Sequence, residues 1–215
     1  MDSPKSQNIT WHRPIITKED KERLLGQKAF TLWFTGLSRS GKSTLAAEVE
    51  KRLYERGCLT FILDGDNIRH GLNRNLGFSP EDREENIRRI GEVAHLFSQA
   101  GIINMAAFIS PYRSDRKKAR DLAKEGEFIE VFCRCSLEAC EKRDRKGVYE
   151  KARAGEIAEF TGISAPYEDP ENPEITIETG KETIDEGVNS IISYMEENGF
   201  IEGRGHPLEI KYSLL

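Results

Sequence analysis

The chain lacks long apolar runs, has little cysteine and has no excess of positive charge. Its 215 residues include 4 cysteines and carry a formal net charge of −5. No apolar run approaches the roughly 20 residues of a membrane-spanning helix, and the residues after Met1 are polar instead of forming a signal-peptide core. An acidic surface repels a nucleic-acid backbone. These absences disfavour a membrane protein and a general nucleic-acid binder, and we expect a cytoplasmic protein.

The four cysteines leave two interpretations open. Cys133 and Cys135 would share one face of a predicted strand, while Cys58 and Cys140 lie elsewhere in the sequence. No nearby histidine completes a zinc-binding set, so we expect reduced thiols that are mostly buried or structural. A zinc site is the alternative.

The clearest motif in the chain is a phosphate loop. Residues 36–43, Gly-Leu-Ser-Arg-Ser-Gly-Lys-Ser, match the pattern G-x-x-x-x-G-K-[ST] without a mismatch. The apolar run at 30–34 precedes the loop, and Leu45, Val49 and Leu53 recur after it at helical spacing. A strand before the loop and a helix after it are the context that such a loop requires.

Each residue type of the loop has a physical role. Two glycines let the backbone turn its N–H groups towards phosphates, and the helix start adds its positive dipole end. Lys42 would neutralise phosphate charge, and the Ser43 hydroxyl would bind Mg²⁺. The expected nucleotide-binding residues are Gly36, Leu37, Ser38, Arg39, Ser40, Gly41, Lys42, Ser43 and Thr44.

Strands and helices are predicted to alternate along the chain. The expected strands cover residues 30–34, 58–63, 102–109, 128–132 and 175–177. Helices are expected after the phosphate loop, after Ser79-Pro80, around 116–123, after Ser136 and after Thr183. This order predicts an α/β fold: a P-loop NTPase-like three-layer sandwich with a mostly parallel sheet of about five strands and helices on both faces.

The carboxyl ends of the predicted strands locate the chemistry. The phosphate loop, an acidic loop at residues 64–67 and the dipeptide Ser110-Pro111 each follow a strand. In an open parallel sheet such segments meet at one edge, where ligands bind.

We expect one main domain with three accessory segments. Residues 29–199 form the domain, and the charged, glycine-containing residues 143–160 are a lid candidate whose cations could close over phosphates. A solvated helical face is the alternative for 143–160. Residues 1–28 are expected to be an arm and 200–215 a tail. The apolar residues of the arm that could anchor it to the body, or to a partner subunit, are Trp11, Ile15, Ile16, Leu24 and Leu25.

Several longer strings resemble the adenylyl-sulfate kinase family. They are residues 33–38 (Trp-Phe-Thr-Gly-Leu-Ser), 63–69, 71–73, 76–83, 85–86, 108–112, 151–157 and 160–163. The resemblance extends from about residue 8 to the last helix. It implies ATP-dependent phosphorylation of the 3′-hydroxyl of adenosine 5′-phosphosulfate (APS), with ATP and Mg²⁺ as cofactors and a homodimer as the assembly.

The same resemblance implies roles for individual residues. Substrate contacts are implied for Asp64, Asp66, Arg69, Phe78, Arg83, Asn86, Ile109, Ser110, Lys146, Phe160 and Gly162. Arg143 is implied at the adenine of ATP, and catalytic roles are implied for Lys42, Asp64, Asp66 and Ser110. The residue types fit, because aromatic faces can stack on a purine and arginines can fork onto phosphosulfate oxygens.

The division of labour among the catalytic groups is a hypothesis. We assign Asp66 to the proton of the 3′-hydroxyl and Asp64 to the Mg²⁺ shell through water. The family associates Ser110 with a phosphoserine intermediate, but no histidine or lysine adjoins it in residues 108–112 to activate it. We therefore expect direct transfer, with Ser110 positioning the substrate. Arg39 stands where the family usually has a small residue, and we expect its side chain to point away from the phosphates.

Three other functions share parts of this pattern. A GTPase switch also has a phosphate loop. The string Thr17-Lys18-Glu19-Asp20 resembles the guanine-reading motif T-K-x-D of that class, but it precedes the phosphate loop, whereas GTPases carry the motif after it. A kinase of another small metabolite would have the same fold. An inactive module is the third alternative, although the catalytic residue types are intact.

Overall fold

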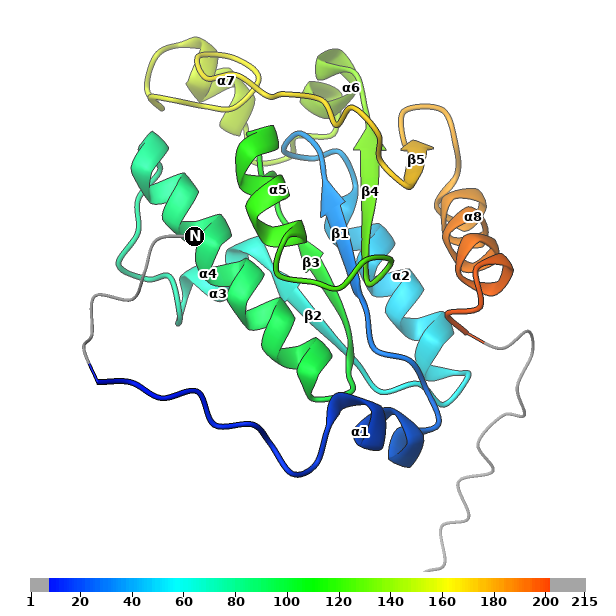
Figure 1. Ribbon diagram of the computed structural model, residues 1–215. Helices are drawn as coiled ribbons and strands as arrows, with labels where there is room; N and C mark the ends of the chain where they lie inside the picture. Colours follow the sequence, from blue (N-terminus) through cyan, green and yellow to red (C-terminus); the bar gives the residue numbers. More distant parts are fainter. Residues whose placement is uncertain (1–7, 202–215) are drawn as a thin grey trace, which may run out of the picture.

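The computed structural model describes residues 8–201, and a five-stranded sheet lies at its centre (Figure 1). The strands are β1 (Thr31–Thr35), β2 (Thr60–Asp64), β3 (Ile103–Ala107), β4 (Phe128–Arg134) and β5 (Ile175–Glu178). Their order is β2-β3-β1-β4-β5, and every neighbouring pair is parallel. The expected fold class is confirmed.

Helices cover both faces of the sheet and bury two separate cores. On one face lie α2 (Lys42–Tyr54) and α8 (Ile184–Glu197), and on the other lie α4 (Pro80–Gln99) and α5 (Arg113–Arg120) (Figure 1). Side chains alternate along a strand, so β1 serves both cores. Leu32 and Phe34 pack with the residues of α2 and α8, whereas Trp33 packs with those of α4 and α5. The centre of the sheet is therefore buried on both sides.

Four of the five predicted helix starts are those of the structure, those of α2, α4, α6 (Leu137–Lys142) and α8, whereas the helix expected around 116–123 is α5 and begins at Arg113. Ser79 caps α4 with its hydroxyl, and Pro80 is the first helical residue. Thr183 and Glu186 form a capping box at α8, and Ser136 caps α6. These caps bind backbone N–H groups that have no partner inside the helix, which fixes where each helix begins.

The acidic segment after β2 is a helix and not the loop that the sequence suggested. Helix α3 (Gly65–Arg69) begins directly after the strand. Asp64 Oδ1 accepts the backbone N–H groups of Asp66 and Asn67 at 3.0 and 3.4 Å. The reason is that Asp64 caps the helix, a role available to an aspartate at a strand end.

Part of the segment expected to be an arm packs on the body. Helix α1 (Lys18–Leu25) begins with a capping box between Thr17 and Asp20, so the string resembling a guanine-reading motif is a helix cap. Lys18 Nζ donates to the Ala29 carbonyl at 2.9 Å and pairs with Glu127 at 2.7 Å. The buried ammonium also pairs with Glu22 at 3.5 Å, and these contacts fix the helix, which the sequence analysis did not predict.

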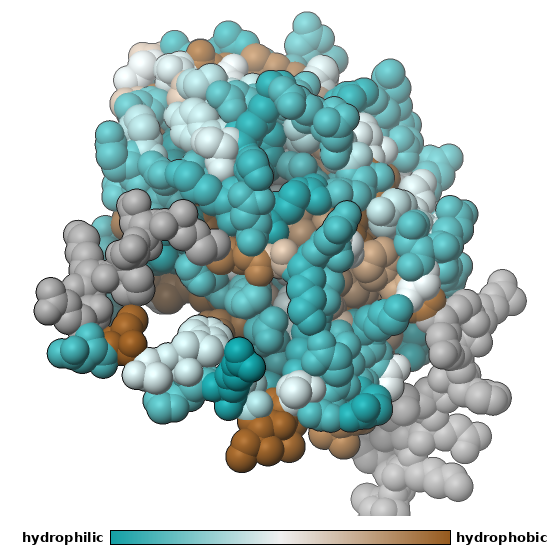
Figure 2. Space-filling model, viewed as in Figure 1, coloured by the Kyte–Doolittle hydropathy of each residue, from teal (hydrophilic) through white to brown (hydrophobic). Residues whose placement is uncertain are grey.

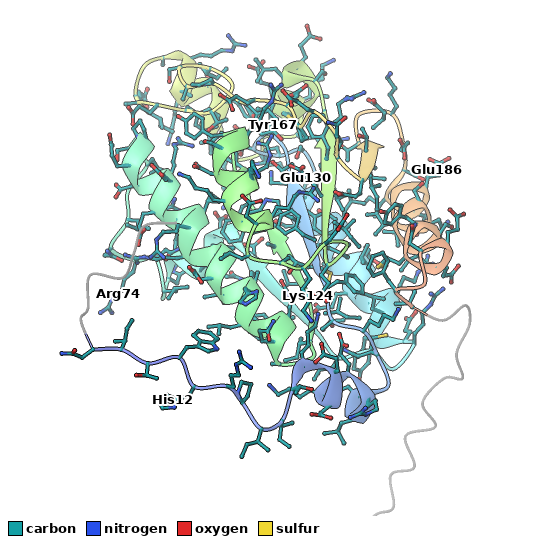
Figure 3. All side chains as sticks on the ribbon, viewed as in Figure 1. His12, Arg74, Lys124, Glu130, Tyr167 and Glu186 are labelled. Carbon is teal, nitrogen blue, oxygen red and sulfur yellow. The ribbon has the colours of Figure 1, made fainter. Side chains whose placement is uncertain are left out.

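The residues before α1 run along the outside of the molecule. Trp11 is 85% exposed and Ile15 is 94% exposed, and Ile16 is exposed as well, as is Leu24 on α1 itself. His12, labelled in Figure 3, lies on this extended segment away from the sheet. Figure 2 shows hydrophobic surface at the lower edge of the view, on the segment that leads into α1. These apolar residues therefore do not anchor the segment to the core.

Two further segments complete the description. The lid candidate contains α7 (Val148–Arg153), which lies with α6 beyond the carboxyl ends of the strands (Figure 1). The predicted tail falls outside the described residues except for Phe200 and Ile201, and the Phe200 ring lies 4.8 Å from the ring of Phe30. Within residues 8–201, none of the helices has the length and apolar character to span a bilayer.

Candidate active site

A cavity of about 710 Å³ opens at the carboxyl ends of the strands. This volume is in the range of small-molecule sites. The predicted site residues that line it are Ser38, Arg39, Gly41, Lys42, Ser43, Thr44, Asp64, Asp66, Phe78, Ile109, Arg143, Lys146 and Phe160. The structure therefore brings the phosphate loop, the β2 end, the β3 end and the lid candidate to one cavity.

The loop between β1 and α2 requires its glycines. Gly36 has φ +147°, and a Cβ there would lie 2.6 Å from the Cys133 carbonyl oxygen. Gly41 has φ +97° and is the residue immediately before α2. No other residue adopts such φ values easily, so the loop geometry depends on these two positions.

Lys42 is held inside the loop by backbone oxygens. Its side chain is nearly buried, and Nζ donates to the carbonyls of Gly36 at 3.0 Å and Leu37 at 2.6 Å. Burial lowers the pKa of Lys42 to about 8. The sequence analysis did not predict this burial. It places the ammonium under the loop that would surround phosphates.

Ser43 and Asp64 form a pair suited to Mg²⁺. Ser43 Oγ donates to Asp64 Oδ2 at 2.7 Å, and both residues line the cavity. Mg²⁺ in phosphotransfer sites usually takes one or two protein oxygens together with phosphates and water. Residues 8–201 contain no cluster of three or more His, Cys, Asp or Glu arranged to hold a metal ion. A hydroxyl and a carboxylate beside a phosphate loop nevertheless fit the expected ion.

Asp66 differs from Asp64 in its contacts. Asp64 is committed on both carboxylate oxygens, to Ser43 on one side and to the start of α3 on the other. Asp66 lies in the first turn of α3 and lines the cavity. Within the described chain its carboxylate takes part in none of the hydrogen bonds or ion pairs, which leaves it able to accept a proton.

Ser110 faces the core instead of the cavity. Its hydroxyl accepts from Trp33 Nε1 at 3.1 Å and donates to Thr35 Oγ1 at 3.0 Å, and the residue is 2% exposed. Its backbone is in the left-handed region at φ +41°. Its neighbour Ile109 lines the cavity and Ser110 does not. The predicted contact of its hydroxyl with substrate thus remains a prediction, and this enclosure does not support it.

Phe78 lines the cavity on the α4 side, and the two arginines Arg69 and Arg83 lie near its ring. Phe78 is 60% exposed and lines the cavity, and the Arg69 guanidinium lies 4.3 Å from its ring centroid. Arg83 donates to Thr161 Oγ1 at 2.7 Å and to the Glu159 carbonyl. Burial lowers the pKa of both arginines. The two cations are thus engaged with protein oxygens and do not themselves line the cavity.

Asn86 and Gly162 support the walls from outside. The Asn86 side chain is buried and accepts from Asn73 Nδ2 at 2.9 Å. Gly162 has φ +89°, and a Cβ there would lie 3.0 Å from the Leu37 side chain. Neither residue lines this cavity, and neither do Gly36, Leu37 and Ser40 of the phosphate loop; Leu37 and Gly162 line a separate cavity.

The lid candidate is attached to the site by an aromatic residue that the sequence analysis missed. Tyr149 is 2% exposed, and its hydroxyl donates to the Ser38 carbonyl at 2.8 Å. Its ring meets Phe160 edge-on, with centroids 4.9 Å apart. Among the lid cations, Arg143 already has a partner in the body of the protein, because its guanidinium donates to the Thr179 carbonyl. The reason is that β5 ends beside the lid.

The segment after β5 also lines the cavity and was not predicted. Its lining residues are Thr179, Glu182, Thr183 and Ile184. The sequence carried a signal for them, because they follow the last strand of a parallel sheet and ligands bind at strand ends. The capping pattern that begins at Thr183 predicts only the start of α8.

Comparisons with known proteins agree on one family. The sequence profile of the family described as adenylylsulphate kinase matches residues 28–178. The adenylyl-sulfate kinase of Staphylococcus epidermidis is 59% identical over 196 residues, which are 91% of this chain and 98% of that protein.

Solved structures extend the comparison to the fold. The structure of Mycobacterium tuberculosis APS kinase in complex with AMPPNP and APS has a TM-score of 0.75 and 48% identity, and covers 79% of this chain and 99% of that one. A hexameric APS kinase from Thiobacillus denitrificans has a TM-score of 0.62 and 35% identity, over 82% of this chain and 30% of that one. The expected resemblance is confirmed, and this chain belongs to the adenylyl-sulfate kinase family.

Proposed function

We propose that this chain transfers the γ-phosphoryl group of ATP to the 3′-hydroxyl of APS, which gives 3′-phosphoadenosine 5′-phosphosulfate and ADP in sulfate assimilation. One observation carries the proposal beyond family membership. A single cavity runs from the phosphate loop to Phe78 and Phe160. Donor and acceptor can therefore meet in one enclosure, as transfer between two bound nucleotides requires.

The donor end of the cavity is built to hold phosphates. The N–H groups at the start of α2 and the Lys42 ammonium supply positive charge there. Because phosphoryl transfer through a loose transition state needs mainly alignment and charge neutralisation, these groups act without forming a covalent bond.

Ser43 and Asp64 would hold Mg²⁺ next to the phosphates. When bound, the ion supplies additional neutralisation of phosphate charge. The carboxylate of Asp64 also keeps α3 in place through its second oxygen. Asp64 thereby links the metal position to the position of Asp66, which lies two residues further on.

Asp66 is the group proposed to accept the proton of the 3′-hydroxyl. Its carboxylate lines the cavity and has no competing partner among residues 8–201. Phe78 and Phe160 are proposed to hold the purine of APS between their faces, since both rings line the same cavity. Lys146, also in the lining, would bring a cation to the phosphosulfate group.

Two properties of the whole protein belong to this proposal. The exposed Trp11 and Ile15 favour a homodimer, because large apolar side chains on an extended segment are stabilised by a second surface. A cytoplasmic location is supported by the use of ATP as donor and by the four free cysteines, since thiols persist in reducing compartments.

An assay of ADP release with APS as acceptor tests the activity. We expect turnover with ATP and APS, and a loss of about 100-fold or more in Lys42→Ala, which removes a cation at the transferred group. Circular dichroism of the variant checks that the fold is retained. GTP as donor and a nucleoside or sugar acid as acceptor test the alternatives. Turnover with one of these and none with APS would refute the proposal.

A further inference from the structure

Arg39 has an unusual conformation for its position in the phosphate loop. Its φ of +62° lies in the left-handed region, which non-glycine residues rarely adopt. Its side chain is one third exposed and lines the cavity. Nε is buried and makes no hydrogen bond within residues 8–201, but it lies 3.5 Å from Asp144 Oδ1. The side chain therefore points along the cavity wall towards the lid, where this ion pair forms.

Asp144 organises the first turn of the lid. Its carboxylate is 2% exposed, Oδ1 accepts the Lys146 N–H at 3.2 Å and Oδ2 accepts the Tyr149 N–H at 2.7 Å. Burial would raise the pKa of Asp144, but the N–H groups of Tyr149 and Lys146, together with Arg39, hold it below the usual range. The buried carboxylate is therefore charged at neutral pH.

Arg39 is the partner of this buried charge. In the described part of the chain, Asp144 forms an ion pair with Arg39 and with no other cation. Removing one partner of a buried pair leaves an uncompensated charge, which is strongly unfavourable unless the segment moves towards water. For Asp144 to reach water, the turn that its carboxylate holds, residues 144–149, would have to shift.

The lid start carries a residue of the cavity wall. Lys146 lines the cavity, and Asp144 holds its backbone N–H. In the first turn of α7, the Tyr149 hydroxyl donates to the carbonyl of Ser38, the neighbour of Arg39. Two consecutive phosphate-loop residues thus contact two lid residues that flank Lys146.

We propose that Arg39 is a positioning residue that couples the phosphate loop to the lid: through Asp144 it holds Lys146 at the cavity. The identity of the substrate that Lys146 meets rests on the proposed function above.

The test compares Arg39→Asn with Arg39→Lys. Asparagine tolerates the left-handed region, so Arg39→Asn removes the cation with little added backbone strain. We expect the KM for APS to rise by about tenfold while kcat changes by less than about threefold, because the Lys146 ammonium, which would bind APS equally in the ground and transition states, is no longer held in position. Amide exchange of residues 144–149 should become faster in the ligand-free protein. Arg39→Lys should restore much of both properties.

The matched control is Arg88→Asn, which removes an arginine that is 53% exposed and pairs with Glu85 on α4. It should change neither the KM nor lid exchange. The proposal fails if Arg39→Asn behaves like this control. It also fails if Arg39→Asn has its full effect in a Lys146→Ala background, since Arg39 would then act without Lys146. If the wild type does not phosphorylate APS, the proposed function is wrong, whereas amide exchange still tests the Arg39–Asp144 link.

Discussion

Lys42 has a charged form that burial disfavours in the free protein and that bound phosphates would favour. Its ammonium is buried under the phosphate loop, and carbonyl oxygens are its main hydrogen-bond partners. Burial favours the neutral amine, which explains the low pKa of about 8. Phosphate groups would favour the charged form instead. The proton of Lys42 is therefore coupled to nucleotide binding.

This coupling predicts proton uptake when ATP binds. Below about pH 8 Lys42 is already charged, and as pH rises through its pKa the free protein loses this proton, which bound phosphates would restore. We expect uptake to grow from near zero at neutral pH towards one proton per ATP, with affinity falling by roughly tenfold per pH unit above that pKa. Calorimetry in buffers of different ionisation enthalpy measures the uptake. Equal uptake by Lys42→Gln would contradict this origin.

Ser110 bears on the choice between direct and relayed transfer. Its hydroxyl is bonded to Trp33 and Thr35, neither of which can act as a general base. Its carbonyl accepts from Arg116 Nη1 at 2.7 Å, and Arg116 in turn pairs with Glu130, which is labelled in Figure 3. Ser110 is thus a structural residue of the loop after β3 in this conformation.

We predict that Ser110→Ala retains measurable turnover. The substitution leaves the buried Trp33 N–H without its acceptor, so the free energy of unfolding should fall by about 1–3 kcal/mol. Denaturant unfolding measures this loss, and transfer from ATP with a chiral γ-phosphate measures the stereochemistry. Direct transfer inverts the configuration. Retention in the wild type would indicate two displacements and restore Ser110 as a phosphoryl carrier.

At the scale of elements, the lid candidate has side chains that contact the rest of the protein and an exposed side chain at the cavity. Tyr149 is buried against the phosphate loop, and Arg153 pairs with Glu141 of α6 at 2.6 Å. Lys146, by contrast, is exposed at the cavity. Ordering on ligand binding should therefore concentrate in the turn around Lys146 and not in α7.

Hydrogen exchange with and without ligands tests this prediction. Residues 143–160 should gain protection when an ATP analogue and APS are both present, because phosphate and phosphosulfate charges supply a partner for the Lys146 ammonium at the cavity. The gain should be largest at residues 144–147 and smaller in α7. Identical protection of the whole segment in both conditions would rule out a lid.

At the scale of the whole molecule, several of the exposed apolar residues lie on the segment before α1. Helix α1 is fixed by Lys18, so the extended residues that precede it leave the body at a defined point. Ile9, Trp11 and Ile15 all lie on this extended segment, and each is more than half exposed. A surface of this kind is typical of an interface between chains.

We predict a homodimer that depends on this segment. Sedimentation at micromolar concentration should give twice the 24.4 kDa mass of one chain. Replacing Trp11 and Ile15 by serine should weaken the dimer, because burial of each large apolar side chain contributes about 1.5–3 kcal/mol. Leu72→Ser, which changes an exposed leucine elsewhere, is the control. A monomeric wild type would overturn the prediction.

The sequence by itself determined the sheet, the starts of four helices (α2, α4, α6 and α8) and the family. A turn, a helix cap or an apolar period depends on neighbouring residues alone, so each can be predicted from a short stretch of sequence. The examples in this chain are the phosphate-loop glycines, Asp64 at the end of a strand, and the caps at Ser79 and Thr183. The order of strands and helices then placed the site at one edge of the sheet.

The tertiary structure decided which side chains face the cavity and which are enclosed. Ser110 turns towards Trp33, seventy-seven positions away in sequence, and Tyr149 reaches Ser38 across a separation of 111. Contacts between distant segments likewise bury Lys42 and place Arg39 beside Asp144. Burial, pKa shifts and ion pairs of this kind depend on distances between segments remote in sequence, which only packing of the folded chain fixes.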